Sequence, residues 1–94
     1  MAASSTEAHA VHDNRAAHRL EIEVGGSVAY AEYQLAPGTI TFTHTLVPEA
    51  LRGRGIGTEL VEAGIALAKE RALKLVPVCP FFVAYLRSHP PAQP

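Results

Sequence analysis

The first regular pattern in the chain is an alternation of apolar and polar residues at positions 19–24. Leu20, Ile22 and Val24 fall on one side of an extended chain and charged residues fall on the other, which predicts a strand with one buried face. Gly25-Gly26 follows, and a glycine pair between two alternating segments is typical of a two-residue hairpin turn. A second, antiparallel strand is therefore expected at residues 27–35.

A third alternating segment covers residues 39–47, after a turn predicted at Pro37-Gly38. Four residues are expected on its apolar side and four threonines on the other; the apolar side carries Ile40, Phe42, His44 and Leu46. Three strands joined by short turns predict an antiparallel meander.

The spacing then changes to a helical period. Between about Gly55 and Ala72 the apolar residues recur three or four positions apart, which predicts an amphipathic helix. Residues 75–79 form a short apolar strand, expected to lie parallel to its partner because a helix separates the two. Pro80 suits the first turn of a second helix at residues 81–88, which Pro90 would end.

These elements predict a compact α+β fold with the order β-β-β-α-β-α, in which a three-strand antiparallel meander gains one parallel strand after the helix crossover. A chain of 94 residues suits one domain. We place that domain at residues 14–90, with a disordered tail at 1–13 and a short tail at 91–94.

Composition narrows the classes of function. The net charge is −1 with neutral histidines, which argues against a nucleic-acid binder because such proteins usually need a basic face. No apolar run reaches the roughly 20 residues of a membrane-spanning helix, and a lone cysteine, Cys79, fits a reducing compartment. We expect a cytoplasmic protein. His9, His12 and His18 lie near one another, but no cysteine or carboxylate cluster accompanies them, so we expect no metal site.

The candidate chemistry lies in Arg52-Gly53-Arg54-Gly55-Ile56-Gly57, where the first helix begins. Glycines let the backbone approach a ligand closely, and the first turn of a helix offers free N–H groups and a positive dipole end. The loop therefore indicates an anion cradle for a phosphate or pyrophosphate; a flexible turn without a ligand is the alternative. The Walker loop and the dinucleotide fingerprint both require other residues or spacings.

A third pattern fits, because Arg52-x-x-Gly55-x-Gly57 resembles the Q/R-x-x-G-x-G/A signature of the GNAT superfamily of N-acetyltransferases. The stretch at residues 42–49, the stretch at 78–81 and His89-Pro90 resemble a branch of small single-domain members. The resemblance covers about residues 14–90. It departs at the end, where Pro91-Ala92-Gln93-Pro94 differs from the usual continuation of the branch.

This resemblance implies that acetyl-CoA is the acyl donor and an amine the acceptor. The backbone amides of residues 52–58, from Arg52 through Gly53, Arg54, Gly55, Ile56 and Gly57 to Thr58, would bind the pyrophosphate of coenzyme A. The pantetheine arm would pair with the end of the third strand near Leu46 and Val47, as a neighbouring strand would. GNAT enzymes commonly hold a pair of parallel strands apart to admit the thioester. Pro77 would help these strands to separate because it lacks an N–H, or it marks a sheet edge.

Three side chains are candidates for catalysis. Cys79 precedes the second helix, whose N-terminus favours a thiolate nucleophile; a small buried residue is the alternative. Tyr85 could protonate the departing thiolate, or pack in the core. His44 could be the general base, or a satisfied core or rim group. Glu49 and Glu32 are further candidates for the base.

Two functions compete most directly. The first is an acetyl-CoA-dependent N-acetyltransferase, and the second is a coenzyme A-binding module with little catalysis. Larger GNATs wall the acceptor site with helices between their first two strands, where we expect the Gly25-Gly26 turn. An open acceptor site favours a protein or peptide amine. We expect a monomer or a weak homodimer. A structural interaction domain would leave the loop unexplained.

Overall fold

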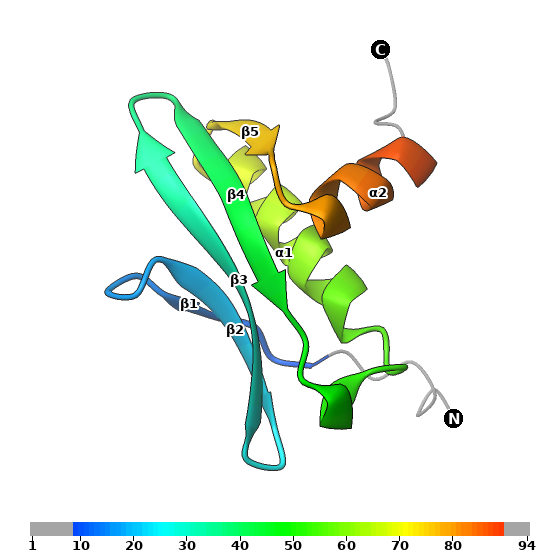
Figure 1. The fold of residues 1–94 in the computed structure, drawn as a ribbon. Coiled ribbons are helices and arrows are strands. Elements are labelled where there is room, and N and C mark those ends of the chain that lie inside the picture. The colour runs from blue at the N-terminus through cyan, green and yellow to red at the C-terminus, as the bar shows by residue number, and fades with distance from the viewer. Residues whose placement is uncertain (1–8, 90–94) are drawn as a thin grey trace, which may run out of the picture.

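The computed structural model of the chain describes residues 9–89, and Figure 1 shows a sheet with two α-helices packed on it. The elements are β1 (His12–Asn14), β2 (Arg19–Val24), β3 (Ser27–Ala36), β4 (Thr39–Leu46), the 3-10 helix η2 (Glu49–Leu51), α1 (Ile56–Glu70), β5 (Lys74–Pro77) and α2 (Pro80–Ser88). The tail predicted at residues 91–94, and most of the tail predicted at residues 1–13, lie outside the described residues.

The five strands form one sheet in the order β1-β2-β3-β4-β5. Neighbouring strands from β1 to β4 are antiparallel, and β5 is parallel to β4. Gly25 and Gly26, at φ 59° and 86°, form the tight turn between β2 and β3, because two successive positive φ angles suit the twist of a hairpin. The predicted α+β architecture is confirmed, with one added strand at its N-terminal edge.

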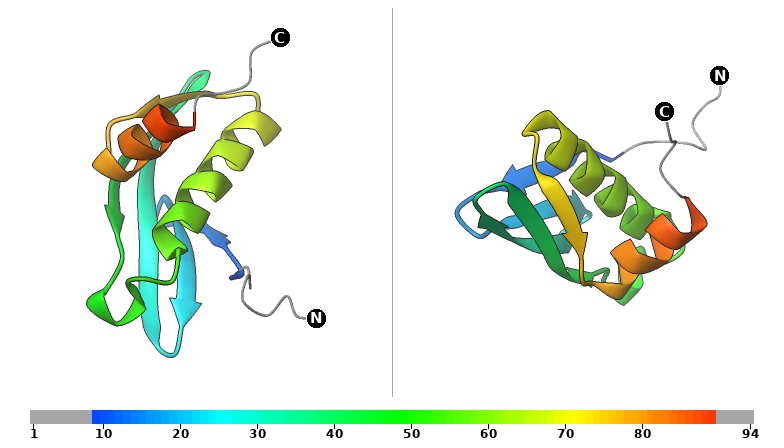
Figure 2. Two further views of the ribbon diagram at one scale, coloured as in Figure 1. Left: turned by 90° about the vertical axis from the view of Figure 1, so that its right-hand side faces the viewer. Right: turned by 90° about the horizontal axis from the view of Figure 1, so that it is seen from above.

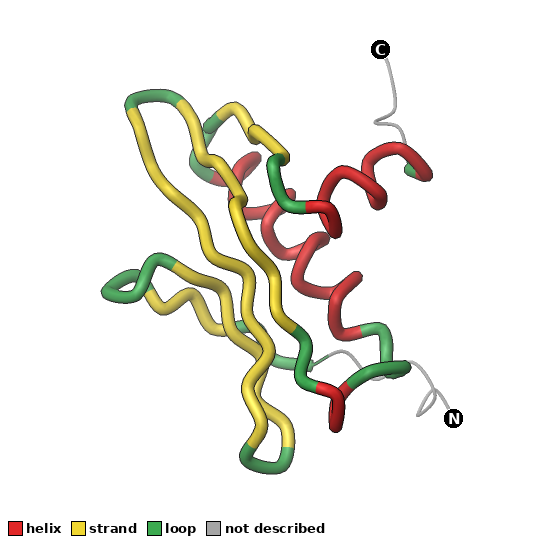
Figure 3. Tube along the Cα trace, viewed as in Figure 1, coloured by secondary structure: helices red, strands yellow, loops and turns green. Residues whose placement is uncertain are grey.

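Both helices cover the same face of the sheet (Figure 2). Helix α1 contacts β2, β3, β4 and β5, while α2 packs beside it against β4 and β5. Phe42 of β4 stacks on Phe82 of α2 with ring centroids 4.3 Å apart. This contact requires glycine at position 64, because a Cβ there would lie 2.8 Å from Phe42 Cζ. The opposite face of the sheet, called the outer face below, carries no helix among residues 9–89 (Figure 3).

Strand β1 was not predicted, and contacts with distant segments of the chain hold it in place. The buried Tyr33 hydroxyl donates a 2.6 Å hydrogen bond to Asp13 Oδ1, and Arg71 donates one of 3.3 Å to Asp13 Oδ2. Burial first, and then the bond to Asp13, raises the pKa of Tyr33 to about 12.

Because β1 is an additional first strand, the connection that carries helices in larger GNATs corresponds to a different turn from the one predicted. The first two strands are β1 and β2, and a turn at residues 15–18 joins them, with His18 N donating to Arg15 O at 3.2 Å. This turn, and not Gly25-Gly26, stands where larger GNATs were expected to carry helices.

The predicted face of His44 and Leu46 is wrong, because a β-bulge interrupts β4. Tyr33 pairs with Phe42 but Glu32 pairs with His44, which leaves Thr43 as an extra residue. A bulge swaps the sides of a strand beyond it. His44 and Leu46 are consequently exposed, whereas Thr45 turns toward the helices.

No helix among the described residues is long and apolar enough to cross a membrane.

Candidate functional site

The central feature of the site is the divergence of β4 and β5. Their last register pair is Phe42 with Pro77, and the N–H groups of Val78 and Cys79 both donate to Phe42 O, at 3.1 and 3.0 Å. The chain then turns into α2, so residues 43–46 pair with β3 alone among the described strands. Pro77 therefore lies both on an edge strand and at the point where the strands diverge. One backbone edge of β4 is left open to a ligand.

The glycine-rich loop begins close to this open edge. Gly53 and Gly55 have φ angles of 81° and 75°, and Gly55 is the N-cap of α1. Because Glu59 N is the donor to Gly55 O, the N–H groups of the preceding helical residues have no acceptor within the helix. Arg52 donates through Nε to Val47 O at 3.3 Å, which ties the loop to the strand end.

The acidic side chain in the first turn of α1 does not occupy these amides. Glu59 instead binds the N-terminal segment, with His9 N 2.7 Å from Oε1 and His9 Nδ1 2.8 Å from Oε2. Arg52 and Arg54 are exposed beside the loop. The positive end of the α1 dipole and both guanidinium groups are thus available to an anion.

A cavity of about 470 Å³ runs from the end of β4 to the loop, and we call it the strand cavity. Its lining comes from Thr45, Leu46, Val47, Leu51, Arg52, Gly53, Gly55, Ile56, Gly57 and Phe81. The cavity therefore contains both residues predicted to pair with pantetheine and most of the predicted pyrophosphate loop.

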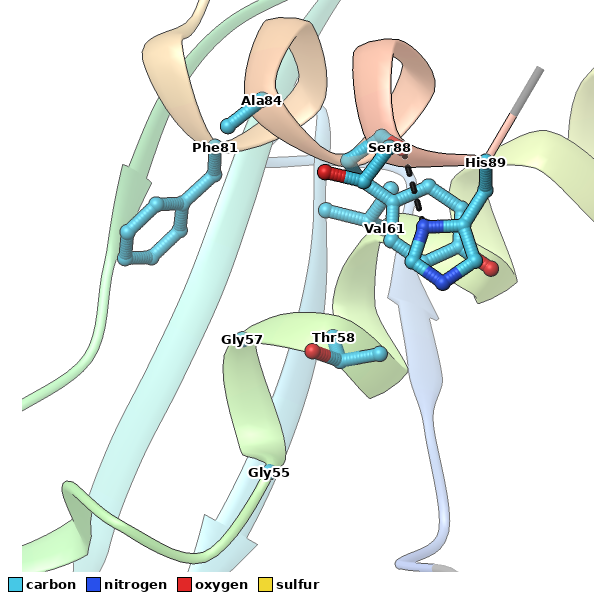
Figure 4. Close-up of a pocket in the computed structure, with 9 residues that line it drawn as sticks. Gly55, Gly57, Thr58, Val61, Phe81, Ala84, Ser88 and His89 are labelled. Carbon is cyan, nitrogen blue, oxygen red and sulfur yellow. Dashed lines mark hydrogen bonds between the residues drawn. The ribbon is translucent and has the colours of Figure 1, made fainter.

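A second cavity of about 370 Å³ lies between the start of α1 and the helix α2, and we call it the helix cavity (Figure 4). Its lining comes from Gly55, Gly57, Thr58, Val61, Phe81, Ala84, Tyr85, Ser88 and His89. The two cavities share three residues: Gly55, Gly57 and Phe81.

The shared residues make a close approach possible. A Cβ on Gly57 would lie 3.2 Å from Phe81 Cε2 and 3.7 Å from Val47 Cγ2. Phe81 is 43% exposed, so its ring borders both cavities near the surface. Gly57 and Phe81 are therefore packed against each other where the two cavities meet.

The structure separates the three candidate catalytic residues. His44 lies on the outer face, where its ring centroid is 6.1 Å from that of Tyr30. Cys79 is buried and its Sγ donates to Thr45 Oγ1 at 3.1 Å. Tyr85 lies in the helix cavity, where its hydroxyl donates to Glu62 Oε2 at 2.9 Å.

The bond to Glu62 is the main reason that the pKa of Tyr85 is raised above its ordinary value. A raised pKa makes the phenol a weaker acid. The two further base candidates also differ in position. Glu32 is the register partner of His44 on the outer face, and Glu49 is exposed in η2.

Sequence reasoning did not predict Phe81, Thr45 or His89 as members of a site. Phe81 and His89 both belong to segments that carried the family resemblance, so that resemblance could have drawn attention to them. Thr45 gave no signal, because its inward direction depends on the bulge at Thr43.

Comparisons with known proteins identify the family to which this chain belongs. A family model described as GCN5-related N-acetyl-transferase matches residues 19–93. The chain is also similar to Protein NATD1 of Xenopus tropicalis, with 36% identity over 55 residues. That match covers 58% of this chain and 50% of the relative, so it spans about half the length of the relative. The resemblance predicted from the loop and its flanking segments is confirmed.

Proposed function

Because this chain belongs to the GCN5-related N-acetyltransferase family, we propose that it transfers an acetyl group from acetyl-CoA to an amine. The observation that carries the proposal is the juxtaposition of an open β4 edge with a glycine-rich helix start. The strand cavity connects the two. An elongated ligand with an anionic middle and an amide-bearing arm matches that arrangement.

The residues present fit coenzyme A. The amides of residues 52–58 supply N–H donors for a pyrophosphate, and the absence of a side chain at Gly57 lets the Phe81 ring pack against the start of α1. Leu46 and Val47 offer strand backbone to the amides of the pantetheine arm. When bound, acetyl-CoA supplies the acetyl group as a thioester.

His44 is the residue that we propose as general base. It is exposed two positions before Leu46, on the face of the sheet that no described helix covers. An amine approaching from the outer face would meet its imidazole before the open edge of β4. Such a base removes the proton that the amine loses when it becomes an amide.

The side chains of the outer face indicate which class of acceptor could reach His44. Arg19 lies over the Tyr30 ring, with Cζ 4.3 Å from its centroid, and pairs with Glu21 at 2.6 Å. The surface near His44 therefore carries charged and polar side chains, and His44 lines neither the strand cavity nor the helix cavity. This supports a protein or peptide amine as acceptor.

We propose direct attack by the amine and no covalent enzyme intermediate. Cys79 is 3% exposed and its thiol donates to Thr45. We therefore interpret it as a structural residue that packs where β4, β5 and α2 meet. Tyr85 receives no role as acid here, because its hydroxyl is bound to Glu62 within the helix cavity.

The open acceptor side also favours a second candidate, a coenzyme A-binding module without efficient catalysis. Only a short turn, at residues 15–18, joins β1 to β2, in place of the helices that larger GNATs carry there. An acceptor protein would then have to complete the site, or no transfer would occur.

Turnover separates the two candidates. The protein is incubated with acetyl-CoA and a library of amines and peptides, and both the free coenzyme A released and the product masses are measured. We expect release above the enzyme-free rate, and we expect His44→Gln to lower kcat/KM by about 100-fold without weakening coenzyme A binding. The matched control is His12→Gln, which changes an exposed histidine of β1 and should leave the rate unchanged.

The outcomes that contradict this proposal are distinct. Binding of coenzyme A with no release above background selects the module. An acetyl group retained on the wild-type protein and absent from Cys79→Ala replaces direct attack with the covalent route.

A further inference from the structure

Glu59 places a negative charge beside the helix start that we propose as an anion site. It is the acidic residue in the first turn of α1, and its N–H donates to the O atom of the N-cap Gly55 at 3.0 Å. Long side chains on a helix lean toward its N-terminus. A free carboxylate at this position would therefore approach the positive end of the helix dipole, and it would compete with a pyrophosphate there.

His9 holds this carboxylate by both of its oxygens. The His9 backbone N–H donates to Glu59 Oε1 at 2.7 Å, and His9 Nδ1 lies 2.8 Å from Oε2. Because an ionised carboxylate only accepts hydrogen bonds, Nδ1 is a protonated ring nitrogen that donates. The side chains of His9 and Glu59 are 22% and 21% exposed, so water and salt screen this contact less than one at the open surface. The Glu59 oxygens are thus engaged with the segment that precedes β1.

The start of α1 has no side-chain cap that would replace a ligand. Gly55 has no side chain, and no side-chain hydrogen bond caps the helix there. Among the ion pairs of residues 9–89, none joins Glu59 to Arg52 or Arg54. The dipole and the two guanidinium groups are therefore left to an external anion for as long as His9 keeps Glu59 in place.

We infer that His9 is a positioning residue for coenzyme A, which it never touches, because it holds the Glu59 carboxylate away from the pyrophosphate site. The inference rests on the proposed function and deepens it, since it makes affinity for the acyl donor depend on the N-terminal segment. His9 lines neither the strand cavity nor the helix cavity. Figure 1 shows the chain before β1 running toward the start of α1, where this contact is made.

A purely structural role for the contact makes a different prediction. If the pair only anchored the N-terminal segment, removing either partner would have the same effect on ligand binding. A positioning role separates the two partners, because His9→Ala frees a negative charge near the site whereas Glu59→Gln removes that charge. The two substitutions should then change the affinity for coenzyme A in opposite directions.

Calorimetry with coenzyme A tests the inference without any turnover. We expect His9→Ala to weaken binding by about threefold and Glu59→Gln to strengthen it by about threefold, which is the usual size of one charge effect at a helix terminus. The double variant should bind as tightly as Glu59→Gln alone, since His9 then has no charge to hold. Two matched controls, His12→Ala in β1 and Glu70→Gln at the last residue of α1, should leave the affinity unchanged.

Thermal unfolding of the same samples provides the contrasting measurement. Both single variants weaken the same contact, so both should unfold at a lower temperature than the wild type while their affinities move apart. His9→Asn keeps a side-chain N–H donor near the position of Nδ1 and should retain the affinity of the wild type. This variant also serves if His9→Ala does not fold.

Equal weakening of coenzyme A binding by His9→Ala and Glu59→Gln, or no change in either, would overturn the inference and leave the proposed function standing. A loss in His9→Ala that persists in the double variant would also overturn it, because His9 would then act without Glu59. Failure of the wild type to bind coenzyme A at all would instead remove the proposed function together with the inference.

Discussion

The two halves of β4 have different surroundings although they belong to one strand. Residues 39–42 pair with β3 on one side and β5 on the other, and Ile40 and Phe42 are fully buried between the sheet and the helices. Residues 43–46 pair with β3 alone among the described strands, begin with a bulge and expose His44 and Leu46. We therefore expect the first half to contribute most of the stability, while the second half supplies the open backbone edge.

The bulge at Thr43 marks the boundary between these halves. Before it, an apolar side chain faces the core at every second position. Beyond it the sides are exchanged, so His44 faces outward while Thr45 meets Cys79 at the junction with α2. One inserted residue thereby brings a titratable side chain to the outer face just as the neighbouring strand departs.

The largest effect should come from Phe42→Ala in the first half. Phe42 stacks on Phe82 and meets Tyr33 edge-on at 5.7 Å, so its truncation leaves a cavity and should destabilise the fold by about 3–5 kcal/mol. Leu46→Ala, in the second half and 41% exposed, should change stability by about 0.5 kcal/mol or less. Urea denaturation measures both.

Equal losses of stability in the two variants would contradict the division of β4. If Phe42→Ala does not fold, Phe42→Leu provides a milder truncation, and its loss should still exceed that of Leu46→Ala.

An intermediate effect is expected at the start of α1. Gly57→Ala should leave stability unchanged or slightly higher, because alanine favours a helix and the crowded Phe81 ring is exposed enough to shift. The same methyl group should displace the Phe81 ring, which lines the strand cavity, and so weaken the binding of coenzyme A by about tenfold or more. Calorimetry and thermal unfolding on the same samples separate these effects. Ala66→Gly, at an exposed position of α1, should reverse the pattern, with lower stability and unchanged affinity.

The smallest effect concerns the anchor of β1. Tyr33→Phe removes the hydroxyl that binds Asp13 and should cost about 1 kcal/mol near neutral pH. Because the folded state raises the pKa of Tyr33 from 10 to about 12, this stabilisation is complete below pH 10 and is lost as the pH rises toward 12. Denaturation curves at several pH values should therefore converge for the two proteins at alkaline pH. A difference that is constant across this range would mean that ionisation of Tyr33 is not linked to folding.

Much of the fold could be predicted because its signals are local. The alternation before and after Gly25-Gly26 gives a hairpin, and Pro80 gives the first turn of α2. Strand β1 could not be predicted in this way, since contacts of Asp13 with Tyr33 and Arg71, far along the chain, hold it. The bulge also lacks a local signature, because Thr43 fits the regular alternation of residues 39–46 and the sequence shows no break there.

The candidate site likewise has a part that local sequence predicts and a part that depends on tertiary packing. The glycine-rich loop could be recognised because its residue types are unusual and contiguous. The helix cavity could not, because it forms where α2 packs on α1, and that packing depends on the absence of a side chain at Gly64. The outward direction of His44 likewise depends on strand register, which composition does not reveal.

Amide NMR during a titration with coenzyme A tests the central claim most directly. We predict that the signals of residues 46–58 shift together with that of Phe81, while the signals of residues 39–42 do not move. Two results would contradict the assignment of this site. One is that no amide signal shifts at millimolar coenzyme A, and the other is that the signals of residues 39–42 shift while those of the loop do not.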